Sequence, residues 1–88
     1  MSNPISVNYG RVSNQRTIDI ITATGAGVTP GGEYGLSFLN TGGTPVTIAG
    51  ETIPANVSVD ADGHGGTLQP ITYDATGGQI KITRTISA

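Results

Sequence analysis

Three short segments of this 88-residue chain alternate apolar and polar residues, at positions 33–40, 57–60 and 80–86. Alternation with a period of two is typical of strands that bury one face. Clusters of Gly, Thr, Pro and Asn separate these segments, as turns require, and no segment sustains a 3.6-residue repeat. The sequence therefore predicts an all-β fold, a small antiparallel β-sandwich or barrel of six to seven short strands.

Two of the predicted strands indicate where the core is expected. In residues 16–24, Ile18 and Ile20 lie on one face and Ile21 on the other, which is typical of a strand covered on both sides. A Gly-rich loop at 25–32 then suits a connection between two sheets. Residues 33–40 place Tyr34 on the same face as Leu36 and Phe38, and this face is the expected centre of the core.

In the remaining predicted strands, Gly50, Pro70 and Arg84 indicate the form or the position of the strand. Residues 45–53 form either one bulged strand or a tight hairpin around Gly50. Pro70 predicts that the strand within 67–74 is an edge strand or carries a bulge. Arg84 shares the apolar face of the last strand, so we expect it at a sheet edge, with its stem buried and its charge in water.

The chain divides into an N-terminal arm or edge strand at 1–15 and a β-sandwich or barrel domain at 16–88. Ile5, Val7 and Tyr9 alternate within the arm, and they are the candidate interface residues. The alternative is a frayed terminus, because terminal segments stay mobile unless something holds them.

Composition favours a scaffold or binding surface over an enzyme. The chain has no Cys, one His and a formal charge of −2, and its four basic residues are scattered, so nucleic acid is not an expected partner. Without disulfides, a domain of this size needs another source of stability, and self-association is the expected one. No apolar run approaches the ~20 residues of a membrane helix, and no signal peptide is recognised at the N-terminus, so we expect synthesis in the cytoplasm.

The loop after residue 60 holds the few groups that could carry chemistry. His64 would need Asp60 or Asp62 to orient it and Ser58 or Thr67 as a nucleophile; we expect an exposed turn instead, without catalysis or a cofactor. Asp60 and Asp62 are weak candidates for a calcium site, because carboxylates two residues apart can converge on one cation. The EF-hand pattern fails, since Ile71 stands where its bidentate Glu belongs.

The three tyrosines, Tyr9, Tyr34 and Tyr73, could form a platform for stacking sugars, although core or interface packing explains them more simply. An alternative function follows from them, a glycan- or receptor-binding module of a phage tail or fibre. Such a module would use Tyr73 together with Asp60, Asp62 and His64.

Residues 32–86 resemble a β module found in small structural proteins of tailed bacteriophages. The features that carry the resemblance are EYGLSFLNTG, a Gly-x-x-Ile-Pro-Ala step at 50–55, an acidic Gly-rich loop and ITYDATG at 71–77. The resemblance implies a non-enzymatic virion component, such as a capsid decoration (cement) protein or a head accessory protein. We expect a homo-oligomer, with a trimer preferred, whose partners are its own copies and a major capsid or other virion protein.

Overall fold

The computed structural model describes residues 15–88, which form eight strands and no helix. The arm residues Ile5, Val7 and Tyr9 lie outside this range. In chain order the strands are β1 (Arg16–Ala23), β2 (Ala26–Val28), β3 (Gly35–Asn40), β4 (Val46–Ile48), β5 (Glu51–Ile53), β6 (Ser58–Asp62), β7 (Thr72–Asp74) and β8 (Ile80–Ser87). Residues 15–88 accordingly include no helix able to cross a bilayer.

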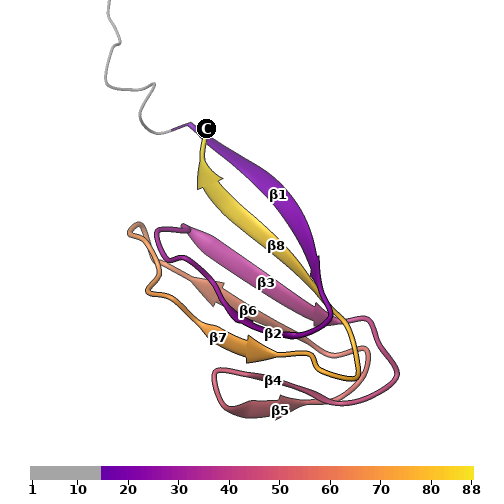
Figure 1. Ribbon diagram of the computed structural model, residues 1–88. Helices are drawn as coiled ribbons and strands as arrows, with labels where there is room; N and C mark the ends of the chain where they lie inside the picture. The colour runs from indigo at the N-terminus through magenta and orange to yellow at the C-terminus, as the bar shows by residue number, and fades with distance from the viewer. Residues whose placement is uncertain (1–14) are drawn as a thin grey trace, which may run out of the picture.

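The strands pair into two separate antiparallel sheets of four. Sheet A has the order β1-β8-β3-β6, and sheet B has the order β2-β7-β4-β5. Figure 1 shows sheet B lying against the lower part of sheet A, whereas β1 and β8 extend beyond it toward the C-terminus. The fold is a small all-β sandwich, which confirms the prediction from the alternating segments and removes the barrel alternative.

Both sheets contribute to one apolar core. Its buried members are Leu36, Phe38, Val46, Ile48, Ile53, Ala75, Ile80 and Ile82. Full burial of a large aliphatic or aromatic side chain contributes about 1.5–3 kcal/mol, so this short list accounts for most of the stabilisation. The predicted core positions of Leu36 and Phe38 are confirmed, while Tyr34 precedes β3 and is only half-buried.

One buried polar residue ties the end of β3 to sheet B. The side-chain amide nitrogen of Asn40 donates to the carbonyl oxygens of Thr44 at 2.8 Å and Ile53 at 3.1 Å, and its Oδ1 accepts from the amide of Gly42 at 3.0 Å. Because every polar atom of this side chain has a partner, its burial carries no desolvation penalty from an unpaired group. Asn40 therefore fixes the turn that leads from sheet A into β4.

The segment 45–53 is a hairpin, which decides between the two predicted forms. β4 pairs with β5 in a register that joins Val46 to Ile53. The two residues of the turn, Ala49 and Gly50, have φ values of 52° and 83°. Positive φ at both positions defines a type I′ turn, whose twist matches that of the flanking strands.

Two predicted boundaries are wrong for identifiable reasons. The loop at 25–32 contains β2, which raises the strand total of the described residues to eight; Ala-Gly-Val is too short to show alternation. The strand after Pro70 is neither an edge strand nor as long as predicted. It begins at Thr72, so the proline needs no place in the ladder, and β7 lies between β2 and β4.

Candidate functional site

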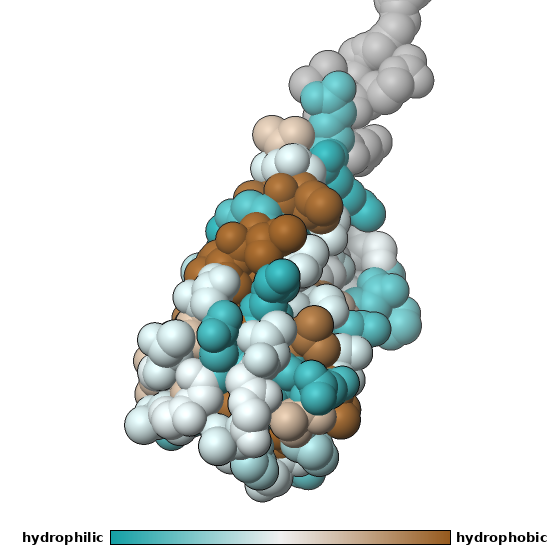
Figure 2. Space-filling view, turned by 90° about the vertical axis from the view of Figure 1, so that its right-hand side faces the viewer, coloured by the Kyte–Doolittle hydropathy of each residue, from teal (hydrophilic) through white to brown (hydrophobic). Residues whose placement is uncertain are grey.

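β1 carries the two most exposed large hydrophobic side chains of residues 15–88. Ile18 and Ile20 are 62% and 59% exposed, and Ile21 on the opposite face is 40% exposed. Figure 2, viewed from the side of β1, shows hydrophobic side chains gathered on this part of the surface. The prediction that β1 is covered on both faces is therefore wrong for residues 15–88, because sheet B does not reach this end of sheet A.

Within residues 15–88, the backbone of β1 also has no partner strand along its outer edge. The Ala88 amide donates to the Gln15 carbonyl at 3.1 Å, so these residues form a hydrogen-bonded pair of the β1–β8 ladder. Such pairs alternate along an antiparallel ladder, and the odd-numbered residues of β1 therefore bond to β8. The even-numbered residues direct their N–H and C=O groups away from β8, namely Arg16, Ile18, Ile20 and Thr22.

Few of the usual protections cover this edge. Natural edge strands avoid pairing with other chains through charged side chains, prolines, bulges or very short length. β1 runs for eight residues in an unbroken register with β8, and its two charges are Arg16 at its first position and Asp19, which is paired with Arg84. No strand within residues 15–88 pairs with its outer side. Apolar side chains and unpaired backbone groups on the same residues make this edge suited to accepting another strand.

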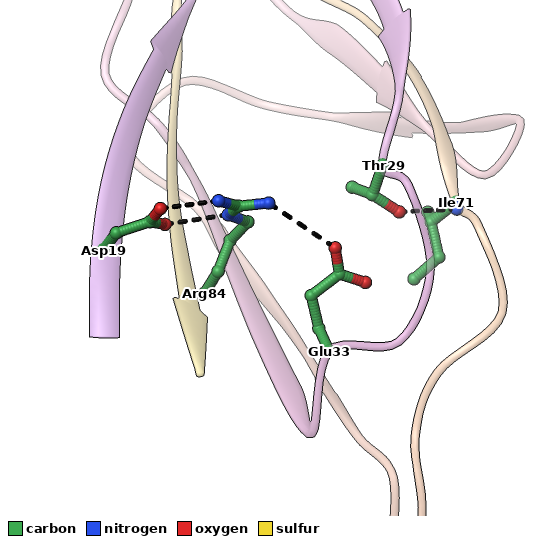
Figure 3. Close-up of polar contacts among 5 residues, drawn as sticks. All are labelled: Asp19, Thr29, Glu33, Ile71 and Arg84. Carbon is green, nitrogen blue, oxygen red and sulfur yellow. Dashed lines mark hydrogen bonds and ion pairs between the residues drawn. The ribbon is translucent and has the colours of Figure 1, made fainter. Parts of the chain in front are cut away.

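The one acidic residue of β1 is held by β8 on the inner face. Arg84 forms a bidentate pair with Asp19, from Nε to Oδ1 at 2.7 Å and from Nη2 to Oδ2 at 2.5 Å (Figure 3). The side-chain hydrogen bond from Arg84 holds the pKa of Asp19 below its ordinary value of 3.8, and the same bond raises the pKa of Arg84. Asp19 is thus occupied within its own sheet.

The same arginine faces a buried carboxylate. Glu33 is 1% exposed, and its Oε2 lies 3.7 Å from Nη1 of Arg84. Within residues 15–88 no hydrogen-bond donor reaches either of its carboxylate oxygens. The expectation that Arg84 lies at a sheet edge is wrong: β8 is an inner strand of sheet A, and the guanidinium bridges two carboxylates. In the sequence, the only indication of this cluster is the position of Arg84 on the apolar face of the last strand.

The outer face of sheet A changes character from one edge to the other. Moving from the isoleucines of β1, the register passes Thr83 of β8 and Ser37 of β3 to Asp60 of β6. Asp60 and Asp62 are exposed on this face, two residues apart on an edge strand. Along this row, sheet A thus passes from an apolar edge through two small residues to an acidic edge.

The loop after β6 uses its polar groups locally. Oδ1 of Asp62 accepts a hydrogen bond from the His64 backbone amide at 2.8 Å, and His64 itself has a φ of 54°. This is the arrangement of an Asx-type turn, and the contact between the two residues runs through the backbone instead of the imidazole. Among residues 15–88, no three His, Asp or Glu side chains are grouped to hold a metal ion.

The tyrosines of the described chain do not form a common platform. Tyr73 faces the core, with its ring centroid 6.4 Å from that of Phe38, whereas Asp60 and Asp62 lie on the outer face of the other sheet. Tyr34 stacks under the guanidinium of Arg16, 4.1 Å from its ring centroid. Of the residues named for the glycan-binding alternative, Tyr73 is therefore separated from Asp60, Asp62 and His64.

Sheet B carries a shallow depression of about 170 Å³ on its outer face. Asp74 lies in it, but its Oδ1 already accepts from the backbone amide of Thr76 at 2.9 Å. Half of the lining residues carry a hydroxyl group, and the lining consists of Pro45, Val46, Thr47, Thr52, Asp74 and Thr76. Compared with this depression, the edge of β1 is the better candidate for a binding site, because it exposes Ile18 and Ile20.

No family model matches this chain, and no curated protein or solved structure matches it either. The resemblance of residues 32–86 to a phage structural module therefore stays a prediction. The candidate site rests on the geometry of β1 alone.

Proposed function

We propose that this chain is a non-enzymatic structural protein of a bacteriophage particle, a capsid decoration or head accessory protein. It acts by forming a homo-oligomer, for which we propose a trimer, and by strand contacts with neighbouring subunits. It is made in the host cytoplasm and ends in the virion. The resemblance of residues 32–86 supports the phage assignment, and the structure supports the mode of action.

The observation that carries the proposal is the exposed edge of β1. An edge that presents Ile18 and Ile20 beside backbone groups without a partner in residues 15–88 loses apolar exposure and gains hydrogen bonds when another subunit pairs with it. A charged fraction of 11% leaves few groups to desolvate at such a contact. Both properties suit a protein whose role is to hold subunits together.

The test is the mass of the full chain in solution, by sedimentation or light scattering, for the wild type and for the double variant Ile18→Lys with Ile20→Lys. We expect an oligomer for the wild type and a monomer for the variant. Both side chains are exposed, so the variant should keep the wild-type unfolding midpoint. Val28→Lys, at a 55% exposed position on edge strand β2, is the matched control and should stay oligomeric.

A monomeric wild type across the accessible concentration range would refute the proposed mode of action. The phage assignment has a separate test, detection of the chain by mass spectrometry in particles purified from its host. Its presence at a constant ratio to the major capsid protein supports the assignment. Its absence from such particles contradicts it.

A further inference from the structure

The sequence contains a segment, residues 5–9, whose alternation of apolar and polar residues fits the outer edge of β1. We propose that the segment 5–9 of a second copy of this chain pairs with the outer edge of β1, so that each subunit gives its arm to a neighbour. This inference rests on the proposed function, and it names the strand that fills the open edge. The pairing is antiparallel, like every pairing within the two sheets.

The alternation of the arm matches the alternation of the edge. The residues of β1 with outward backbone groups also carry side chains on the outer face of sheet A, including Ile18 and Ile20. In a hydrogen-bonded antiparallel pair, opposed residues share a face. A segment with Ile5, Val7 and Tyr9 on one face can therefore place all three on the face that carries the exposed isoleucines.

One register satisfies both the apolar contacts and the charges. It opposes Val7 to Ile18 and Ile5 to Ile20, which gives two aliphatic cross-strand pairs. Shifting the arm by two residues in one direction opposes Arg11 to Arg16, and like charges directly opposite one another are destabilising. Shifting it in the other direction opposes Val7 to Arg16 and loses an aliphatic pair.

The length of chain before β1 allows the exchange. Gln15 is fixed by its bond with Ala88, and five residues, 10–14, separate it from Tyr9. Extended residues span at most about 3.5 Å each, so this linker reaches roughly 17 Å. That distance carries the arm to a subunit packed against the same end of the molecule; a return of the arm to its own β1 through residues 10–15 is the competing arrangement, and the test below separates the two. An exchange that runs head to tail closes in a ring of three subunits when the rotation between neighbours is a third of a turn.

Paired cysteines test this register directly, because the natural chain has none. In the full-length double variant Val7→Cys with Ile18→Cys, the two Cα atoms would lie about 5.5 Å apart, within the range of a disulfide. We expect mild oxidation to convert the protein largely into covalent multimers on a non-reducing denaturing gel. Ile5→Cys with Ile20→Cys tests the same register at a second place, in case the first pair disturbs folding.

The control is Val7→Cys with Thr83→Cys. Thr83 lies on the same face but one strand further in, opposite Ile20 on β8, so its distance from the arm exceeds disulfide reach. This variant should remain monomeric on the denaturing gel after the same oxidation.

The outcomes separate this inference from the proposed function. A disulfide within one chain, or equal cross-linking in the control, overturns the exchange of arms even if the wild type is an oligomer. A monomeric wild type contradicts the proposed function itself. Covalent multimers confined to the two matched pairs support both.

Discussion

Nη1 of Arg84 and Oε2 of Glu33 lie 3.7 Å apart where the chain passes from sheet B into sheet A. Glu33 is the most deeply buried acidic residue of the core region, and the arginine supplies the nearest positive charge. Removing one member of a buried pair leaves the other charge without compensation. The stability of the junction between the sheets therefore depends on a single guanidinium.

Substituting Arg84 with Met should destabilise the fold strongly, because the stem is kept while the charge is lost. We expect a decrease on the order of 3 kcal/mol in the free energy of unfolding, measured by urea denaturation. The double variant Arg84→Met with Glu33→Met should recover most of this loss, since no buried charge remains. An unchanged urea midpoint for the single variant would show that Glu33 does not need its partner.

Replacing Asn40 with Ala should remove three hydrogen bonds at once. The carbonyls of Thr44 and Ile53 and the amide of Gly42 each lose a partner. At about 1 kcal/mol for each net hydrogen bond, thermal or chemical unfolding should show a loss of about 3 kcal/mol. Thr41→Ala, at the adjacent exposed position, is the control and should leave the midpoint near that of the wild type.

The pH dependence of stability should include a contribution from Asp74. The side-chain hydroxyl and the backbone amide of Thr76 lower the pKa of Asp74 below its ordinary value of 3.8. A carboxyl group with a depressed folded pKa adds stability above pH 3.8, and this stability is lost as the pH falls through the lower folded value. Unfolding midpoints measured from pH 5 down to pH 2 should therefore fall less steeply in Asp74→Asn than in the wild type. Parallel curves would contradict this origin.

A substitution at one of the two turn positions between β4 and β5 should make the protein more stable to heat. Ala49 has a φ of 52°, a left-handed conformation that costs an alanine roughly 1 kcal/mol. Asn accepts this conformation more readily, and Asn-Gly is the preferred type I′ pair. We expect Ala49→Asn to raise the melting temperature by about 4 °C. Gly50→Ala should lower it, because Gly50 has a φ of 83°.

Alternation was sufficient to predict the fold class and much of the core. It placed Leu36 and Phe38 correctly because a strand with one covered face must repeat every two residues. It could not predict which end of each sheet the other sheet covers, and this is why Ile18 and Ile20 were expected to be covered. That information depends on the offset between the two sheets, which no local pattern encodes.

The polar cluster illustrates a second limit of the sequence. Arg84 on an apolar face was recognised as an exception, but its partners lie 65 and 51 residues earlier in the chain. Only the β1–β8 register brings Asp19 opposite to it. Asn40 gave no signal, because a polar residue at a strand end is normally solvated. The exposed edge of β1 was likewise invisible until the strand order was known.

The pairing of β1 with β8 also has a consequence for how the chain is made. Arg16 pairs with Ser87 and Ala23 pairs with Ile80. β1 therefore cannot pair with β8 until the C-terminal strand has left the ribosome. Contacts between residues this far apart slow folding, because a long loop must close before they form. During that interval no strand of residues 15–88 pairs with either edge of β1. Subunits synthesised close together on one messenger RNA could meet at this stage, when strands are most easily shared.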